Sequence, residues 1–363
     1  MTLSPERKRV RELVLRYGWN ATAYQLLNPG LAYWFAPDAE AVVGYVPAAA
    51  RPGGRHAAWV AAGGPVCPAE AVGAIATQFE AAAAAAGCRV CWFGADRRLR
   101  ASRSGRTGYA EMTLGAQPVW DPHRWPAILA GKASLRAQRN RARNKGVAVT
   151  RWDTDRAERD PGLRRCLAEW LARRGLPPLH FLVEPDTLGA LADRRVFVAE
   201  RAGAPVGFLV LSPVPARGGW LVEQIIRGDG APNGTGTLLL DAAMRHAAGA
   251  GATYLTLGLS PLSTRAPASS PNPLWLRLLL GWLRAHGRRF YDFRGLEAFK
   301  AKYVPDRWDP ITAITNERRP SPGTLYAVAD AFSGPRSPTA LIGEALWRAA
   351  RDEARTARRW LSS

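Results

Sequence analysis

The chain has 363 residues, enough for two domains, and its 47% hydrophobic and 22% charged residues are ordinary for a globular protein. Fifty Lys and Arg stand against thirty Asp and Glu, a formal net charge of +20. This excess indicates a polyanionic partner, nucleic acid or an anionic membrane surface; a GC-rich genome is the alternative explanation. Residues 1–16 contain no signal-peptide core, and no stretch approaches the ~20 apolar residues of a membrane span. We therefore expect a cytoplasmic protein, either free or peripheral at the inner membrane face.

One pattern occurs twice along the chain. The pattern of residues 33–36 and 43–46 recurs, at the same spacing, in residues 196–199 and 206–209. Each pair is followed by a Gly/Pro loop, a helix and a strand; we expect the helices at 68–86 and 237–248 and the strands at 90–94 and 254–258. Strand, loop, helix and strand form the crossover of an α/β sheet. The sequence thus predicts a duplicated α/β unit with mixed sheets flanked by helices.

The first repeat contains a CxxC formed by Cys88 and Cys91. Residues three apart on a strand point to opposite faces, and no second CxxC completes a zinc site. The five histidines show no HExxH or HxxxH spacing, and no GxSxG occurs. We expect no metal, reduced thiols and no hydrolase triad.

A basic segment without acidic residues connects the repeats. It contains Lys132, Arg136, Arg139, Arg141, Arg143 and Lys145. On a helix, Arg136, Arg139 and Arg143 share one face, where like charges repel unless an anion binds. The segment is therefore interpreted as an anion-binding helix, with a solvated linker as the alternative.

Three motifs carry a family resemblance. They are residues 135–147 (LRAQRNRARNKGV), 227–235 (RGDGAPNGT) continuing to 257–262 (LGLSPL), and 293–305 (FRGLEAFKAKYVP) followed by 308–310 (WDP). In this order they resemble the C-terminal catalytic domain of phosphatidylglycerol lysyltransferases, the aminoacyl-phosphatidylglycerol synthases, over roughly residues 8–318. The resemblance implies a tandem GNAT-like (acyl-CoA N-acyltransferase) fold, an aminoacyl-tRNA donor and a lipid hydroxyl as the usual acceptor. It implies a form without the family's membrane-embedded lipid-flipping segment.

The loop before the second helix is the first candidate site. Asn233, Gly234, Thr235 and Gly236 end a strand and open a helix, where backbone N–H groups suit a phosphate or an oxyanion. In coenzyme-A-dependent acetyltransferases the corresponding loop holds the pyrophosphate; here we expect it to hold the 3′-terminal ribose and phosphate of tRNA. The alternative is a sharp turn with an ordinary N-cap.

The candidate catalytic residues flank this loop. Glu223, a carboxylate in an apolar strand, is either a general base or the partner of Arg227 at i+4 on the same face. Lys300 and Lys302 alternate with apolar residues; on a strand both would face one side and stabilise an oxyanion or hold tRNA phosphate.

Further cations and the tail complete the predicted binding surface. Arg294 is a candidate phosphate clamp. The tail holds linkers and a basic helix at 340–361, which either lies on an anionic membrane or packs on its own domain.

We predict a first GNAT-like unit at 1–130, a basic connecting helix at 131–150, a second unit with the active site at 151–318, and a linker and basic helix at 319–363. The predicted function is transfer of an amino acid from aminoacyl-tRNA to a lipid headgroup, small molecule or peptide, without a cofactor. Two alternatives stay open: an acyl-CoA-dependent N-acyltransferase, and a non-catalytic protein that binds RNA or anionic lipid.

Overall fold

The structure, a computed structural model, describes residues 4–103, 105–173, 179–267, 271–286, 291–341 and 343–344. The N-terminal half contains α1 (Pro5–Tyr17), the short 3-10 helix η1 (Tyr24–Leu27), β1 (Ala32–Phe35), β2 (Val42–Ala49), β3 (His56–Ala62), η2 (Ala69–Ala71), α2 (Val72–Ala85), β4 (Arg89–Ala95), α3 (Arg97–Arg103) and β5 (Ala110–Trp120).

Four segments lead into the second half, which then repeats the strand pattern of the first. The connecting segments are η3 (Pro122–Arg124), α4 (Trp125–Gly131), α5 (Ala133–Asn144) and β6 (Val147–Trp152). The remaining elements are α6 (Thr154–Arg159), α7 (Pro161–Ala172), β7 (Arg195–Arg201), β8 (Ala204–Val214), η4 (Pro215–Arg217), β9 (Gly219–Arg227), α8 (Thr235–Gly249), β10 (Tyr254–Thr256), β11 (Ser260–Pro261), α9 (Leu274–His286), α10 (Phe293–Ala301), β12 (Arg307–Thr315) and α11 (Pro322–Ser333).

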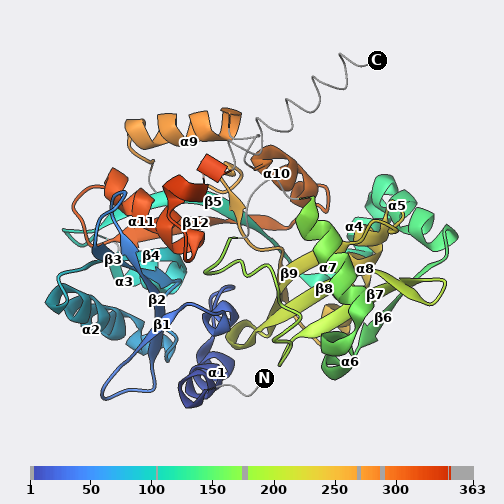
Figure 1. The fold of residues 1–363 in the computed structure, drawn as a ribbon, viewed down its shortest axis with the longest axis horizontal. Coiled ribbons are helices and arrows are strands. Elements are labelled where there is room, and N and C mark those ends of the chain that lie inside the picture. Colours follow the sequence, from blue (N-terminus) through green and yellow to red (C-terminus); the bar gives the residue numbers. More distant parts are fainter. Residues whose placement is uncertain are drawn as a thin grey trace.

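Within the described residues, twelve strands form one sheet in the order β1-β2-β3-β4-β12-β5-β10-β9-β8-β7-β6, with β11 added against β5 (Figure 1). β1, β2 and β3 pair antiparallel and β3 pairs parallel with β4; β7, β8, β9 and β10 repeat this scheme. The repeated sequence pattern therefore corresponds to a repeated pairing scheme. The prediction of an α/β protein with a mixed sheet flanked by helices is confirmed.

The two halves of the sheet are joined at the centre. β12 lies between β4 and β5, antiparallel to both, although it comes almost 200 residues after them in the chain. β5 in turn pairs with β10. The strand at 307–315 thus completes the sheet of the N-terminal half, whereas the proposed unit 151–318 would group it with the C-terminal half.

Alternating side chains place a core on each face of the sheet. In β7 and β8, Phe197 and Leu209 pack with α5 and α8, whereas Val198 and Phe208 pack with α6 and α7. In β4, Trp92 packs with α2 and Phe93 with α1 and α11. Helices thus cover both faces in each half.

The helix boundaries differ slightly from expectation. The first helix begins with the 3-10 turn η2 before α2, and α8 begins at Thr235, two residues earlier than predicted. Most of the predicted tail helix at 340–361 lies outside the described residues. In the part of the chain that the structure describes, no helix is both long and apolar enough to cross a membrane.

Candidate active site

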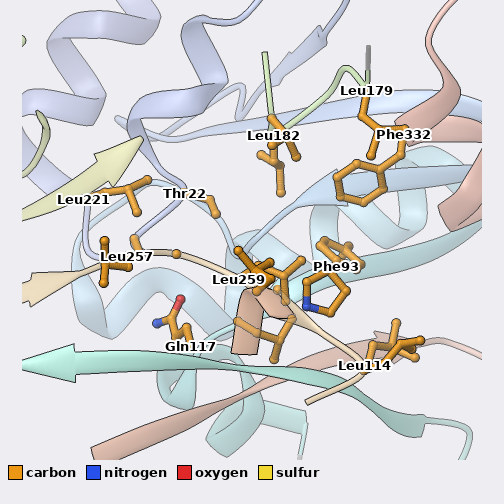
Figure 2. A pocket seen from close by; sticks show the side chains of 18 of the residues that line it. Thr22, Phe93, Leu114, Gln117, Leu179, Leu182, Leu221, Leu257, Leu259 and Phe332 are labelled. Atoms are coloured by element: carbon orange, nitrogen blue, oxygen red, sulfur yellow. The ribbon is translucent and has the colours of Figure 1, made fainter. Parts of the chain in front are cut away.

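A cavity of about 1960 Å³ lies where the two halves of the sheet meet. Figure 2 shows side chains from both halves converging on it, including Phe93 and Leu114 from the first half and Leu221 and Leu257 from the second. Gln117 adds an amide to walls that are mostly apolar (Figure 2). The cavity therefore suits a ligand with a long apolar part and few polar groups.

Lys300 contributes a buried amine to the lining of this cavity. It lies in the last turn of α10, a helix that starts at Asp292, whose carboxylate accepts a hydrogen bond from the Gly295 backbone N–H. Its Nζ donates to the backbone carbonyl oxygens of Gly258 (2.9 Å) and Leu259 (2.7 Å). Burial lowers the pKa of Lys300 to about 7.

The carbonyl groups that bind Lys300 are available because β10 ends early. The strand stops at Thr256, and Gly258 takes a positive φ of +68° that turns the chain away from the sheet. The Gly258 and Leu259 oxygens therefore face Lys300.

Lys302 does not share the environment of Lys300. The condition under which both lysines would face one side, a strand, is not met: Lys300 is helical and Lys302 is the C-cap of α10, so their side chains diverge. The Lys302 ammonium lies 4.6 Å from the ring centroids of Phe299 and Tyr303 and 3.4 Å from the side-chain oxygen of Gln138 in α5. Partial burial, with repulsion from Arg227, lowers the pKa of Lys302.

The predicted glycine-rich site is found at the N-terminus of α8, but α5 packs closely against it. Gly234 has φ +99°, and a Cβ there would lie only 2.0 Å from the backbone oxygen of Gln138. The side-chain oxygen of Gln138 also accepts a hydrogen bond from the Thr237 hydroxyl (2.9 Å). Thr235 and Gly236 are buried, whereas Asn233 is exposed. Only part of this helix end is thus open to a ligand.

Arg227 and Lys302 gather at the same helix end. A Cβ at Gly236 would lie 3.7 Å from Cδ of Arg227, and the electrostatic effect of Arg227 reaches Lys302. Two cations beside a helix N-terminus form a region of positive potential that suits a phosphate group. Arg294 lies elsewhere, exposed in the first turn of α10.

Glu223 binds Arg194, and the predicted ion pair with Arg227 is wrong. The Arg194 guanidinium donates to both Glu223 carboxylate oxygens (2.6 and 3.0 Å), and Gln25 of η1 donates to one of them (2.6 Å). Burial alone would lower the pKa of Arg194, but attraction to Glu223 outweighs it and raises that pKa. The negative charge of Glu223 is therefore balanced by Arg194, and both carboxylate oxygens accept hydrogen bonds.

A β-bulge explains why Glu223 and Arg227 separate. Val210 pairs with Gln224, but its neighbour Leu211 pairs with Val222, so Glu223 is an extra residue in β9. The alternation that would put positions 223 and 227 on one face is interrupted there. Arg227 instead lies beside Gly236 at the start of α8.

The basic segment forms the helix α5, but this helix ends at Asn144 and the predicted range 131–150 also includes the start of strand β6; much of the charge of α5 is bound within the protein. Arg139 and Arg143 approach the buried Asp241 of α8 at 3.7 and 3.8 Å. Arg136 donates to the carbonyl oxygens of Leu129 (2.9 Å) and Ala130 at the end of α4. These contacts attach α5 to the fold.

The sequence profile of the phosphatidylglycerol lysyltransferase C-terminal family matches residues 11–312. The chain belongs to this family. No curated protein sequence matches the chain.

Three solved structures share the fold. The C-terminal domain of a protein described as a lysylphosphatidylglycerol synthetase from Agrobacterium fabrum is 23% identical, with a TM-score of 0.72 over 92% of this chain and 98% of that one. L-PGS from Bacillus licheniformis is 20% identical, with a TM-score of 0.73 over 92% and 97%. FemX is 10% identical, with a TM-score of 0.54 over 91% and 99%. The predicted GNAT-like fold is confirmed, and this member of the phosphatidylglycerol lysyltransferase family is a transferase of the acyl or aminoacyl class.

In this member of the phosphatidylglycerol lysyltransferase family, sequence reasoning missed a further cationic cluster around Trp19, of which Arg97 and Arg217 line the cavity. The guanidinium carbons of Arg98, Arg217 and Arg97 lie 3.6, 4.5 and 5.2 Å from the ring centroid of Trp19. Burial, with repulsion from Arg217 and Arg97, lowers the pKa of Arg98. Among the described residues, Trp19 Nε1 and Arg217 Nε have no hydrogen-bond partner. This cluster suits an anion next to a planar group. No sequence pattern connects its members, because the fold alone brings η4 to the start of α3.

Proposed function

We propose that this chain transfers an aminoacyl group from aminoacyl-tRNA to a hydroxyl or amine, with a lipid headgroup as the preferred acceptor and a small molecule or peptide as the alternative. The observation that carries this proposal is the buried Lys300, whose pKa of about 7 places a titrating amine in a largely apolar cavity. Family membership supports acyl or aminoacyl transfer by this chain.

With the preferred hydroxyl acceptor, the reaction needs one proton to move from the acceptor oxygen to the ribose oxygen. The acceptor oxygen attacks the carbonyl carbon of the aminoacyl ester, forming the new ester bond, and the bond from that carbon to the tRNA ribose oxygen then breaks. The proton leaves the acceptor hydroxyl and ends on the ribose oxygen. An amine with a pKa near 7 both accepts and returns a proton at neutral pH.

Lys300 is positioned for this exchange. Two of its N–H groups are used by the carbonyl oxygens of Gly258 and Leu259. A neutral amine then has its lone pair free, and a protonated amine has a third N–H free. The first form takes the acceptor proton, and the second stabilises the oxyanion of the tetrahedral intermediate. We assign the base role to Lys300 rather than to Glu223, because Arg194 and Gln25 already bind the Glu223 carboxylate.

Cation clusters at two places support a polyanionic donor. One surrounds Trp19, where an arginine pair and an indole match the phosphate and base of a nucleotide. The other is Arg227 with Lys302 at the N-terminus of α8. The arginines of α5 are the weaker candidates, since Arg139 and Arg143 approach Asp241.

The alternative, an acyl-CoA donor, would use the same end of α8 for a pyrophosphate. The contact between Gly234 and the Gln138 backbone argues against it, because this contact closes part of the loop that would surround the pyrophosphate. An acyl-CoA arm in the assay therefore separates the two donors.

The test combines purified full-length protein, a mixed pool of radiolabelled aminoacyl-tRNAs, and phosphatidylglycerol vesicles or cytosolic metabolites, with and without RNase. We expect RNase-sensitive transfer of label to lipid, at least about 100-fold slower in Lys300→Met and unchanged in the matched control Lys8→Met on α1. Transfer only from labelled acetyl-CoA would establish the alternative donor. Binding of tRNA without any transfer, equal in both variants, would reject an enzyme.

A further inference from the structure

Helix α9 exposes an apolar stripe. Among the described residues, seven large hydrophobic side chains are notably exposed, and five of them lie on this helix: Leu274 (66%), Trp275 (37%), Leu278 (64%), Leu279 (38%) and Trp282 (59%). Leu274, Leu278 and Trp282 follow at intervals of four, with Trp275 and Leu279 beside them, so they share one face. A lone exposed leucine needs no explanation, but a continuous stripe of this size indicates a partner.

The opposite face of α9 belongs to the protein. Leu276 is fully buried in the core of the N-terminal half, and Leu280 and Leu283 line the cavity. Leu279 and Trp282 belong to both regions, since they are exposed and also line the cavity. The exterior stripe is therefore continuous with the cavity wall. Helix α9 itself lies at the outer edge of the molecule (Figure 1).

Positive charge flanks the stripe. Residues 274–286 contain Arg277, Arg284 and no acidic residue. Arg277 is exposed, while Arg284 and Arg265 both bind the single carboxylate of Glu297 at 3.2 and 3.0 Å. The residues around the helix thus carry a net positive charge, as the whole chain does with its formal charge of +20.

We propose that α9 is the membrane-binding element of this protein and lies in the interface of an anionic bilayer. Leucines and tryptophans on one face with arginines beside them match the boundary between acyl chains and headgroups, where Trp is favoured and Arg meets lipid phosphate. The occupant is a lipid surface rather than a protein groove, because the stripe continues into a mostly apolar cavity of about 1960 Å³, a volume large enough for an acyl chain. A lipid bound at α9 would pass along this helix into the cavity. This part of the inference rests on the proposed function.

The test is sedimentation of the full chain with vesicles. Wild type should bind vesicles of phosphatidylcholine with 30% phosphatidylglycerol at least tenfold more tightly than pure phosphatidylcholine vesicles. The double variant Leu274→Gln/Leu278→Gln, which changes two exposed residues of the stripe that do not line the cavity, should bind the anionic vesicles at least tenfold more weakly. The control Val304→Gln, which changes an exposed hydrophobic residue after α10, should bind like wild type. Equal binding by the double variant and wild type would overturn the proposal.

Two further measurements keep the outcomes distinct. If the stripe joins two copies of the chain, light scattering will show a dimer that the double variant converts to monomer, with unchanged vesicle binding, and the proposal fails. Aminoacyl transfer to a short-chain phosphatidylglycerol dispersed below its micelle concentration should survive in the double variant, while transfer on vesicles should fall. Vesicle binding by a wild type that shows no transfer would reject the proposed function and leave the role of α9 intact.

Discussion

Lys300 and Gly258 are joined by a hydrogen bond of 2.9 Å from the side-chain nitrogen of one to the backbone oxygen of the other. This bond connects the last turn of α10 to the chain that leaves β10, two elements from the two sides of the cavity wall. It holds a titrating nitrogen at a fixed place without using a carboxylate partner. Burial therefore sets the pKa of Lys300, and no ion pair with another of the described residues opposes that effect.

The pH dependence of transfer should report this lysine. With the pKa of Lys300 at about 7, the neutral amine increases as pH rises from 6 to 8, so single-turnover rates should rise with a midpoint near pH 7. Lys300→Met should lose this rise together with most of the rate, whereas Lys8→Met should retain both. An unchanged pH profile in Lys300→Met would assign the titration to another group.

Stability should also depend on the protonation of Lys300. Its folded pKa of about 7 lies below the ordinary value of 10.5, so between these values the unfolded chain binds more protons and the free energy of unfolding rises with pH. The contribution is at most about 1.4 kcal/mol per pH unit. Denaturant titrations at pH 7, 8 and 9 should show a steeper rise for wild type than for Lys300→Met. Parallel curves would mean that the amine stays charged in the folded state.

Breaking the pair between Arg194 and Glu223 should be costly. Arg194→Met leaves a buried carboxylate without its guanidinium, and such losses amount to about 3–5 kcal/mol. Adding Glu223→Gln to this variant should recover part of the loss, because the neutral amide tolerates burial better. Urea unfolding of both single variants and the double variant measures the coupling. Additive effects would show that the pair does not stabilise the fold.

Gly234→Ala should detach α5 from α8. The new Cβ would meet the Gln138 backbone oxygen at 2.0 Å, and the +99° φ at this position is strained for alanine. We expect a loss above about 1 kcal/mol in thermal unfolding and faster proteolysis within residues 133–144. Gly230→Ala is the matched control, since its nearest neighbour lies 3.9 Å away. Similar behaviour of both variants would contradict the close packing.

Removing two arginines from the cluster at Trp19 should weaken tRNA binding. Arg97→Gln/Arg217→Gln should lower the affinity and reduce the slope of log affinity against log salt by about 1.4, from about 0.7 for each phosphate contact on a single strand. Arg51→Gln/Arg55→Gln removes the same charge from an exposed turn and should change the slope little. Filter binding between 50 and 300 mM salt measures both. Equal slopes for the two double variants would show that the overall charge of the protein, and not the cluster at Trp19, causes the salt-dependent binding of tRNA.

The repeated strands could be predicted because their signals are local. The short, continuous apolar runs at 196–199 and 206–209 are typical of buried strands, and they become part of β7 and β8. The basic helix was likewise recognisable from residues 132–145. The orientation of its arginines was not, since Arg139 and Arg143 point to Asp241, a residue on α8 almost 100 positions away.

The errors at the site come from departures from regular geometry. Glu223 and Arg227 would share a face on a regular strand, but one extra residue in β9 separates them. Lys300 and Lys302 would share a face only on a strand, and the apolar residues that alternate with them cover five positions, too short a stretch to distinguish a strand from a helix. The partner of Glu223 is Arg194, which only tertiary packing brings to β9.

The position of β12 also affects how the protein is made. Because residues 307–315 fill the gap between β4 and β5, the N-terminal sheet cannot close until nearly the whole chain has left the ribosome. At about 5–20 residues per second, β5 waits roughly 10–40 s for its neighbour. During that time two strand edges are free to pair wrongly, so early folding should depend on chaperones. A chain that terminates before residue 307 would therefore lose the N-terminal half as well as the end of the C-terminal one.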